Sequence, residues 1–227
     1  MATYERPETI FGFITADFEN VWDSVAAARN GHGVNYALAL HAMILLEWAA
    51  RLCAADGSGK ALADFNKELE AIEPRYFTKL PGRCCKTKEF VLPHRVSAED
   101  ELLGMLFDLL RNGHGHQYQQ MIAHLDGGGD LVLGVAKVVG GWRLADIEAA
   151  DDRSGHLVLN RLGPDLRVQV RPDLLFLDVR RAISRARLTD RGLNFEHLER
   201  TSGKFYPFGV AGLEQALRDG GLSEPPA

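Results

Sequence analysis

Apolar positions in the first third of the chain repeat with the period of an α-helix. Residues 16–29 place their large apolar side chains on one helical face, and Asn30 and Gly31 then favour an end to that helix. Residues 34–55 are apolar nearly all round, which is typical of the central helix of a bundle. With another helix expected over residues 60–72, the pattern predicts three consecutive helices.

Two further helices are expected on either side of a glycine-containing junction. Ser97 and Asp100 form a variant of the capping pattern, and the apolar residues that follow predict a helix that ends near Arg111. The next helix is expected from about residue 116 to residue 125. Between the third and fourth helices, residues 74–95 are punctuated by proline and glycine, which predicts a long loop.

The pattern changes after the glycines at 127–129. Three short apolar runs follow, at residues 131–139, 156–160 and 166–170. They predict a small antiparallel sheet. Pro172 suits the first turn of a helix, and a last short helix is expected near residues 209–218. We therefore expect a mainly α protein, with a helical bundle over residues 1–126 and a C-terminal α+β annex over residues 127–227.

Composition and charge narrow the class of protein. The 227 residues are 46% hydrophobic and 25% charged, as in an ordinary globular domain, and the net charge is -5. No basic leader precedes an apolar run at the N-terminus, and no apolar stretch is expected to reach the ~18 residues of a membrane helix. The three cysteines lack a metal-binding spacing and are expected to be reduced. A cytoplasmic protein without a membrane segment is the expectation.

Basic residues gather in the segment 74–95 despite the negative net charge. The candidates for RNA contact are Arg75, Lys79, Arg83, Lys86 and Lys88. They alternate with aromatic residues, a combination that allows nucleobases to stack beside paired phosphates. The arginines of residues 180–191 are expected to form a solvated helix face.

The sequence RNGHGHQY, residues 111–118, follows the fourth predicted helix directly. In an unbroken helix Arg111 and His116 would lie about 140° apart around the axis, by the ~3.6-residue period, and would not meet. Gly113 and Gly115 allow the backbone to leave helical geometry at low steric cost. The arginine ending one helix and the histidine beginning the next can then converge, beside N–H groups that suit an anion such as phosphate.

This arrangement resembles the motif of HEPN domains, in which an arginine and a histidine, separated by four to six positions, lie at a helix junction in a helical bundle. The form here, with a tyrosine two positions after the histidine, is similar to the ribonuclease toxin of HEPN and minimal nucleotidyltransferase toxin/antitoxin pairs. The resemblance covers about residues 16–125. It implies metal-independent RNA cleavage by Arg111 and His116 without a cofactor, across a homodimer that brings two motifs together. It also implies a cognate antitoxin or nucleotidyltransferase partner that AMPylates Tyr118, in a defence or toxin/antitoxin setting.

The residue types predict the chemistry of such a site. A neutral histidine with a pKa near ~6.5, such as His116, can take the proton from an RNA 2′-hydroxyl, while the Arg111 guanidinium stabilises charge on the phosphate. The product would carry a 2′,3′-cyclic phosphate. His114, or a histidine of the second subunit, is a candidate acid for the leaving 5′-oxygen. Asn112 and Tyr118 are candidates for positioning the phosphate or the His116 ring.

Two other interpretations follow from a second copy of these letters. Residues 29–36 read RNGHGVNY and have Val34 where the histidine would stand. Arg-Asn-Gly-His-Gly can therefore be a helix stop that this chain uses twice, in a plain helical protein. The other alternative is a noncatalytic HEPN-like module that binds RNA, a nucleotide or a partner protein.

Several polar residues in the predicted helices have simpler roles available. Glu47 lies in the nearly apolar second helix and must be paired, either with Arg111, which it would orient, or with Arg51 four residues on. His41 is expected to be a core histidine. Three further histidines are His114, His116 and His124. They lack the spacing of a zinc-binding helical pair with its third ligand, and no metal is expected.

Overall fold

The computed structural model describes residues 7–27, 34–80, 82–84, 101–107, 109–110, 123–125, 128–136 and 142–191. By its contacts the chain divides into a unit of residues 1–193 and a unit of residues 194–227, and every described residue belongs to the first unit. The described part is mostly helical with a small β part, as the sequence predicts. The expected helix near residues 209–218 lies outside the described residues.

The first three helices are close to the predicted ones. They are α1 (Pro7–Ala27), α2 (Val34–Ala55) and α3 (Lys60–Ile72). Helices α2 and α3 have the predicted bounds, whereas α1 begins nine residues earlier than expected. Pro7 suits the first turn of a helix, and Phe11 stacks on Trp48 of α2 with ring centroids 5.9 Å apart. Packing against α2 therefore extends α1 toward the N-terminus.

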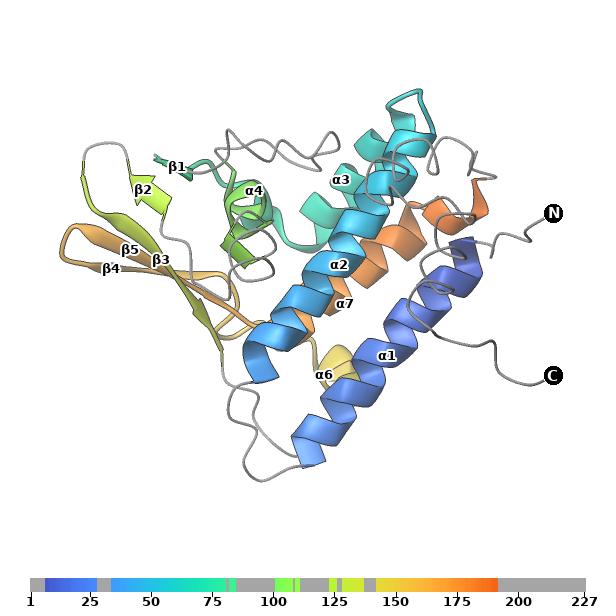
Figure 1. Cartoon of the computed structure of the whole chain (residues 1–227), viewed down its shortest axis with the longest axis horizontal. Helices are drawn as coiled ribbons and strands as arrows, with labels where there is room; N and C mark the ends of the chain where they lie inside the picture. The colour runs from blue at the N-terminus through green and yellow to red at the C-terminus, as the bar shows by residue number, and fades with distance from the viewer. Residues whose placement is uncertain are drawn as a thin grey trace, which may run out of the picture. The chain divides into compact units, whose positions relative to one another are not determined.

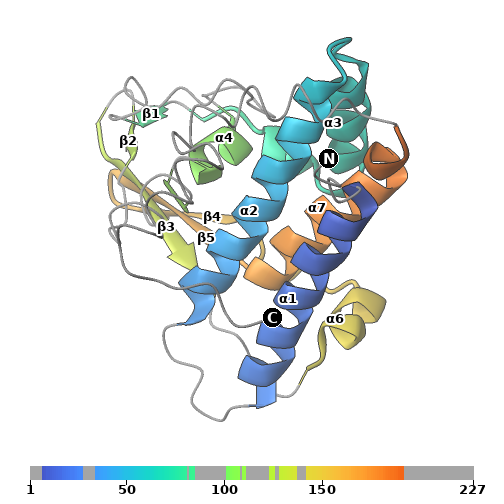
Figure 2. The ribbon, with the colours of Figure 1, turned by 45° about the vertical axis from the view of Figure 1, so that its right-hand side comes forward.

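Helix α7 (Pro172–Arg185) completes the core around α2. It packs along α2 and also against α3, and Figures 1 and 2 show α1, α2 and α7 alongside one another. Phe18 of α1 stacks on Phe176 of α7 with ring centroids 3.8 Å apart, and both side chains are fully buried. Helix α7, which is far from α1 and α2 in the sequence, thus shares one apolar interior with them.

Helix α2 is more apolar than we expected. Residues 35–55 are long and apolar enough, by length and composition, to cross a membrane, with a mean hydropathy of 1.5. The expectation that no stretch reaches this threshold was therefore wrong. In the structure 61% of its most apolar window is buried, and the helices that pack on it are α1, α3 and α7. This is the packing of a central core helix.

The fourth predicted helix is described in part, as α4 (Leu102–Phe107). Its start is attached to the turn η1 (Pro74–Phe77), since the Leu102 N–H donates to the Thr78 carbonyl over 2.9 Å. Residues 123–125 form strand β2, so the helix expected over 116–125 was wrong for these three residues. Pairing with β1 (Gly82–Cys84) on one side and β3 (Asp130–Val135) on the other overrides the local helical pattern.

The strands form one mixed sheet in the order β1, β2, β3, β5, β4. Strands β4 (Val158–Leu162) and β5 (Asp165–Val170) make the predicted antiparallel hairpin. Strand β3 runs parallel to β5, with Leu131 beside Leu166, so an all-antiparallel sheet was wrong. Parallel neighbours need a crossover, and the chain between β3 and β4 supplies α6 (Leu144–Ala150), a helix that we did not predict.

One glycine at the sheet is required by its surroundings. Gly129 precedes β3 with a φ of 91°, and a Cβ there would lie 2.1 Å from the Pro164 carbonyl oxygen in the β4–β5 turn. A residue with a Cβ at this position would have to displace that backbone. The close approach fixes the position of the hairpin beside β3.

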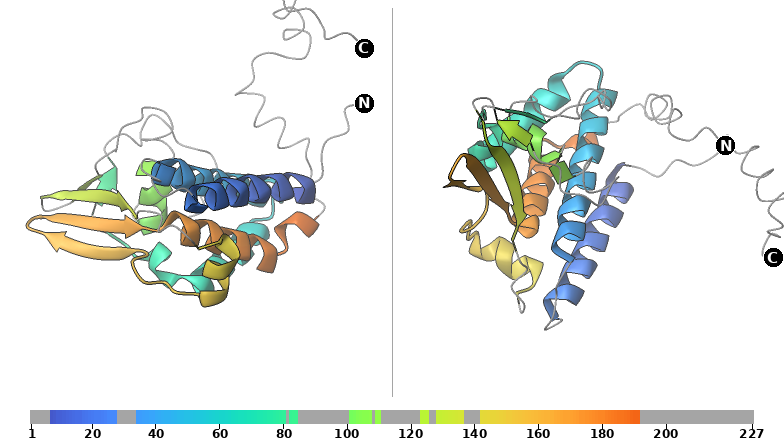
Figure 3. Two further views of the ribbon diagram at one scale, coloured as in Figure 1. Left: turned by 90° about the horizontal axis from the view of Figure 1, so that it is seen from below. Right: turned by 60° about the vertical axis from the view of Figure 1, so that its left-hand side comes forward.

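Packing crosses the predicted boundary at residues 126 and 127. Strand β2 pairs with β3, and α7 covers α2 and α3. Figure 3 (left) shows α7 between the α1–α2 layer and α6. The division of the chain into a bundle and an annex at this boundary stays a prediction.

Candidate functional site

The predicted catalytic motif lies outside the described residues. This applies to Arg111 and His116 and to the supporting residues Asn112, His114 and Tyr118. The residue before the motif, Leu110, is described and 1% exposed. In the sequence, the motif therefore follows directly after a buried residue.

The predicted RNA-binding residues are described in part. Lys86 and Lys88 lie outside the described residues, and only the backbone of Arg83 is described, in β1. Lys79 is exposed, and its backbone forms an isolated β-bridge with Glu101.

Arg75 is committed to partners inside the protein. Its Nε and Nη2 donate to the Glu73 carboxylate over 2.7 and 2.6 Å, and Nη1 donates to the His156 carbonyl over 2.9 Å. A phosphate would have to compete with these bonds. The role of Arg75 in RNA binding stays a prediction.

Two polar residues of α2 make the simpler contacts that we considered. Arg51 donates to Glu47 over 2.6 Å, and the Glu47 side chain is 11% exposed. Its second proposed partner, Arg111, is not described, so orientation of Arg111 by Glu47 stays a prediction. His41 Nε2 lies 3.1 Å from the Ile14 carbonyl oxygen, and the ring meets Phe18 edge-on, which fits a core histidine.

The expected solvated face of arginines near the end of α7 was wrong for three of them. Arg180 bonds to Glu19 of α1 and Glu148 of α6, Arg181 bonds to Glu148 and Asp151, and Arg191 bonds to Asp64 of α3. These side chains are 20 to 23% exposed. They tie α7 and the residues after it to three other helices.

A set of five residues that the sequence did not single out forms what we call the buried polar cluster. Its members are Glu73, Tyr76, Arg153, His156 and Asp178. Arg153 joins two carboxylates, donating to Asp178 over 2.5 Å and to Glu73 over 3.0 Å. The Tyr76 hydroxyl lies 3.0 Å from both His156 Nε2 and an Asp178 oxygen. The cluster joins η1, the segment before β4 and α7.

Hydrogen bonds fix the direction of the protons in the buried polar cluster. The Arg171 backbone N–H donates to His156 Nδ1 over 3.2 Å, so the neutral imidazole carries its proton on Nε2. That proton is donated to the Tyr76 hydroxyl oxygen, and the hydroxyl in turn donates to Asp178. A chain of donors thus runs from His156 through Tyr76 to the carboxylate.

Burial and charge shift the pKa values of the cluster. Burial lowers the pKa of His156, although the neighbouring Asp178 opposes the shift, and the imidazole is neutral. Burial and Asp178 raise the pKa of Tyr76 well above its usual value. Burial would raise the pKa of Glu73, but the bonds from Arg75 and Arg153 outweigh it and lower that pKa to about 2.

The buried polar cluster is closed to substrates. Glu73, Tyr76, His156 and Asp178 are each at most 3% exposed, so a substrate has no access to their polar atoms. Within the part of the chain that the structure describes, Oδ1 of Asp178 is a buried oxygen without a hydrogen-bond partner. Within the described residues no group of three or more potential ligands is arranged to hold a metal ion. The geometry therefore supports a structural role.

The sequence does carry a signal for this cluster. Asp178 follows Leu174 by one helical turn and lies next to Leu177, so it falls on the apolar stripe of α7. A carboxylate in such a stripe must be paired, and an arginine is the expected partner. The identity of that arginine is not predictable, because Arg153 reaches the site from an irregular segment.

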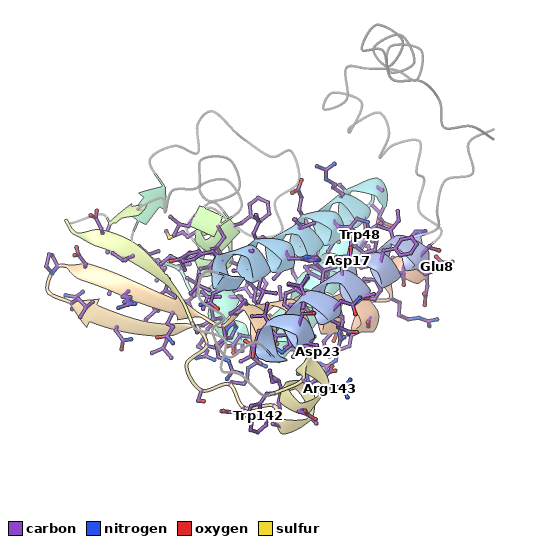
Figure 4. All side chains as sticks on the ribbon, turned by 60° about the horizontal axis from the view of Figure 1, so that its bottom comes forward. Glu8, Asp17, Asp23, Trp48, Trp142 and Arg143 are labelled. Carbon is purple, nitrogen blue, oxygen red and sulfur yellow. The ribbon has the colours of Figure 1, made fainter. Side chains whose placement is uncertain are left out.

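An accessible hollow lies beside α6, and we call it the Trp142 pocket. It has a volume of about 560 Å³. Its lining includes Trp22, Trp142, Ile147, Ser154, Gln169 and Arg171. Trp22 Nε1 donates to the Trp142 carbonyl over 3.0 Å, and the Leu144 N–H donates to Asp23 over 3.4 Å. These bonds attach the segment that carries Trp142 to α1, and Figure 4 shows Trp142 and Arg143 beside α6.

No family model, curated protein or solved structure matches this chain.

Proposed function

We propose that this protein is a metal-independent endoribonuclease of the HEPN type, acting through Arg111 and His116. The observation that carries the proposal is the sequence RNGHGHQY, which follows the buried Leu109 and Leu110 directly in the sequence. A mainly helical core around α2 is compatible with a HEPN-like bundle. The resemblance ends near residue 125, so strands β3, β4 and β5 and helix α7, which packs on α2 and α3, lie outside the region that it covers.

The proposed reaction needs only the residues of the motif. His116 accepts the proton of a 2′-hydroxyl, and the 2′-oxygen attacks the adjacent phosphorus. Arg111 stabilises the charge that builds on the phosphoryl oxygens. The bond to the 5′-oxygen breaks, and an acid, His114 or a histidine of a second copy, gives that oxygen a proton. One RNA strand yields a 2′,3′-cyclic phosphate end and a 5′-hydroxyl end.

The proposed setting follows the same resemblance. A homodimer would bring two motifs together on RNA, with Asn112 and Tyr118 positioning the phosphate. A cognate antitoxin or nucleotidyltransferase would silence the site by modifying Tyr118. Defence or toxin/antitoxin function in the cytoplasm is the proposed context.

The first copy of the motif letters supplies a matched control. Helix α1 ends at Ala27 and α2 begins at Val34, so RNGHG at 29–33 lies between two helices and lacks the later histidine. We would measure cleavage of a mixed RNA pool in EDTA by wild type, Arg111→Ala, His116→Ala and Arg29→Ala, with analysis of the product ends. We expect cyclic-phosphate ends from wild type and Arg29→Ala, and a loss of at least about 100-fold in the two motif variants.

Two results would contradict the ribonuclease proposal. One is equal cleavage by all four folded proteins, and the other is no cleavage by any of them. Either would favour the second candidate, a noncatalytic module that binds a nucleotide, RNA or a partner. The observation in favour of that candidate is the Trp142 pocket, which lies apart from the motif in the sequence.

A further inference from the structure

The Trp142 pocket has one apolar wall made of aromatic and aliphatic side chains. Trp22 of α1 is 2% exposed, whereas Trp142 is 52% exposed. Ile147 and Ala150 of α6 and Pro172 of α7 also line the hollow. A large exposed indole beside a hollow offers a stacking surface for a flat ring.

The described charged residues that line the pocket, Asp152, Arg171 and Asp173, already have partners within the protein. The Arg171 guanidinium donates to Asp173 over 2.7 Å and to the carbonyls of Asp152 and Ser154 over 2.9 and 3.1 Å. The Asp152 carboxylate accepts from the backbone and side chain of Ser154, both over 2.9 Å. Among the described residues that line the pocket, the Arg171 cation is therefore already neutralised by Asp173, which favours an uncharged ligand.

Gln169 of β5 supplies the remaining polar group. Within the described part of the chain its carboxamide makes no hydrogen bond, although it lines the pocket. Its amide nitrogen lies next to Gly155, where even a Cβ would come within 3.6 Å. The carboxamide offers one N–H donor and one carbonyl acceptor side by side on one edge.

We propose that the Trp142 pocket binds an adenine base. The ring stacks against the indole of Trp142, and the Gln169 carboxamide pairs with adenine N6 and N7, the edge that glutamine recognises in nucleic acids. The volume of about 560 Å³ falls in the range of small-molecule sites. The base comes either from a free nucleoside or from an RNA chain. This inference does not rest on the ribonuclease proposal, because it uses none of residues 111–118.

The test is calorimetric titration of the full chain with adenosine, uridine, short oligoadenylate and short oligouridylate. The His116→Ala background is used for the RNA arms, so that cleavage does not remove the ligand. The variants are Gln169→Met, which keeps the size of the side chain, Trp142→Ala and Trp142→Phe. Arg187→Ala, at an exposed residue of a second hollow between α3 and the end of α7, is the control. Thermal unfolding of each variant checks that it is folded.

We expect saturable binding of adenosine or oligoadenylate, with the matching uridine ligand at least about tenfold weaker. Gln169→Met should weaken adenine binding about tenfold and remove the discrimination. Trp142→Ala should weaken it by a similar factor, while Trp142→Phe and Arg187→Ala should stay close to wild type. Binding of oligoadenylate without adenosine assigns the site to RNA, and the reverse assigns it to a free nucleoside.

The proposal is overturned if neither adenine ligand binds wild type. It is also overturned if a folded Gln169→Met variant binds adenine as tightly as wild type.

Discussion

The state of His156 is fixed by a single backbone donor. Because the Arg171 N–H occupies Nδ1, the ring can carry only one proton without losing that bond, and burial disfavours the second proton further. The Tyr76 hydroxyl accepts a hydrogen bond from the remaining proton and donates its own proton to Asp178. Protonation of His156 at low pH therefore destabilises the folded state.

The pH dependence of stability should reveal this residue. The pKa of His156 is lowered in the fold, so above the ordinary value of 6.5 both the folded and unfolded states are neutral there. As the pH falls below that value the unfolded state takes up the proton first, and the free energy of unfolding decreases by at most about 1.4 kcal/mol per pH unit. Urea unfolding at about pH 7.5 and about pH 5.5 measures this slope.

A substitution at His156 tests the assignment. His156→Gln should flatten the slope in that interval, because the glutamine side chain does not titrate. Nitrogen chemical shifts should show the neutral ring with its proton on Nε2 at about pH 7.5. A slope unchanged by His156→Gln, or a doubly protonated ring at that pH, would contradict the assignment.

At the scale of elements, buried contact decides which part of α1 matters. Phe18 and Phe13 lie on the same helix, but Phe18 is fully buried against Phe176 and Phe13 is 57% exposed. Both positions hold a phenylalanine, but one side chain is buried and the other is exposed. They form a matched pair for measuring how strongly α1 is attached to the core.

We expect Phe18→Ala to lower the free energy of unfolding by about 3–5 kcal/mol, because it leaves a cavity at the stacked ring. Phe13→Ala should change it by no more than about 0.5 kcal/mol. Urea unfolding of the two variants gives both values. Similar losses in the two variants would mean that α1 does not pack as described.

A helix or strand can be predicted from the sequence when its own residues determine it, and not when contacts with distant segments do. Helices α3 and α7 follow from apolar periodicity, and α2 follows from being apolar nearly all round over 22 residues. Strand β2 was missed because only pairing with β1 and β3 makes residues 123–125 extended. Helix α6 was missed because a short helix with two buried residues, Leu144 and Ile147, has little periodicity to detect. These elements depend on partners that are distant in the sequence.

At the scale of the molecule, the two candidate sites also differ in how much of each is visible in a local stretch of sequence. The letters of the 111–118 motif are visible in the sequence, but convergence of its side chains is a property of tertiary structure. The Trp142 pocket left no local signal, since Trp22, Trp142 and Gln169 come from three separate segments. The pairing of Arg75 with Glu73 could be guessed from proximity, but its bond to His156 could not.

The role of α7 as a wall of the core predicts what truncation would do. A chain of residues 1–126 lacks α7, so apolar faces of α2 and α3 would be open to water. We expect this fragment to lose cooperative unfolding, while residues 1–193 should keep it. Circular dichroism during urea titration of both fragments tests the expectation. Cooperative unfolding of residues 1–126 would instead support an independent bundle ending at 126.

The order of synthesis gives the burial of α2 a further consequence. Residues 34–55 leave the ribosome early, but their cover, α7, begins only at Pro172. At ~5–20 residues per second, this apolar helix waits roughly ten seconds for its cover. During that time the nascent chain presents a segment apolar enough to pass for a membrane span. We expect that rapid docking of α1, or a chaperone, protects α2 from aggregation and from the membrane-insertion machinery during this interval.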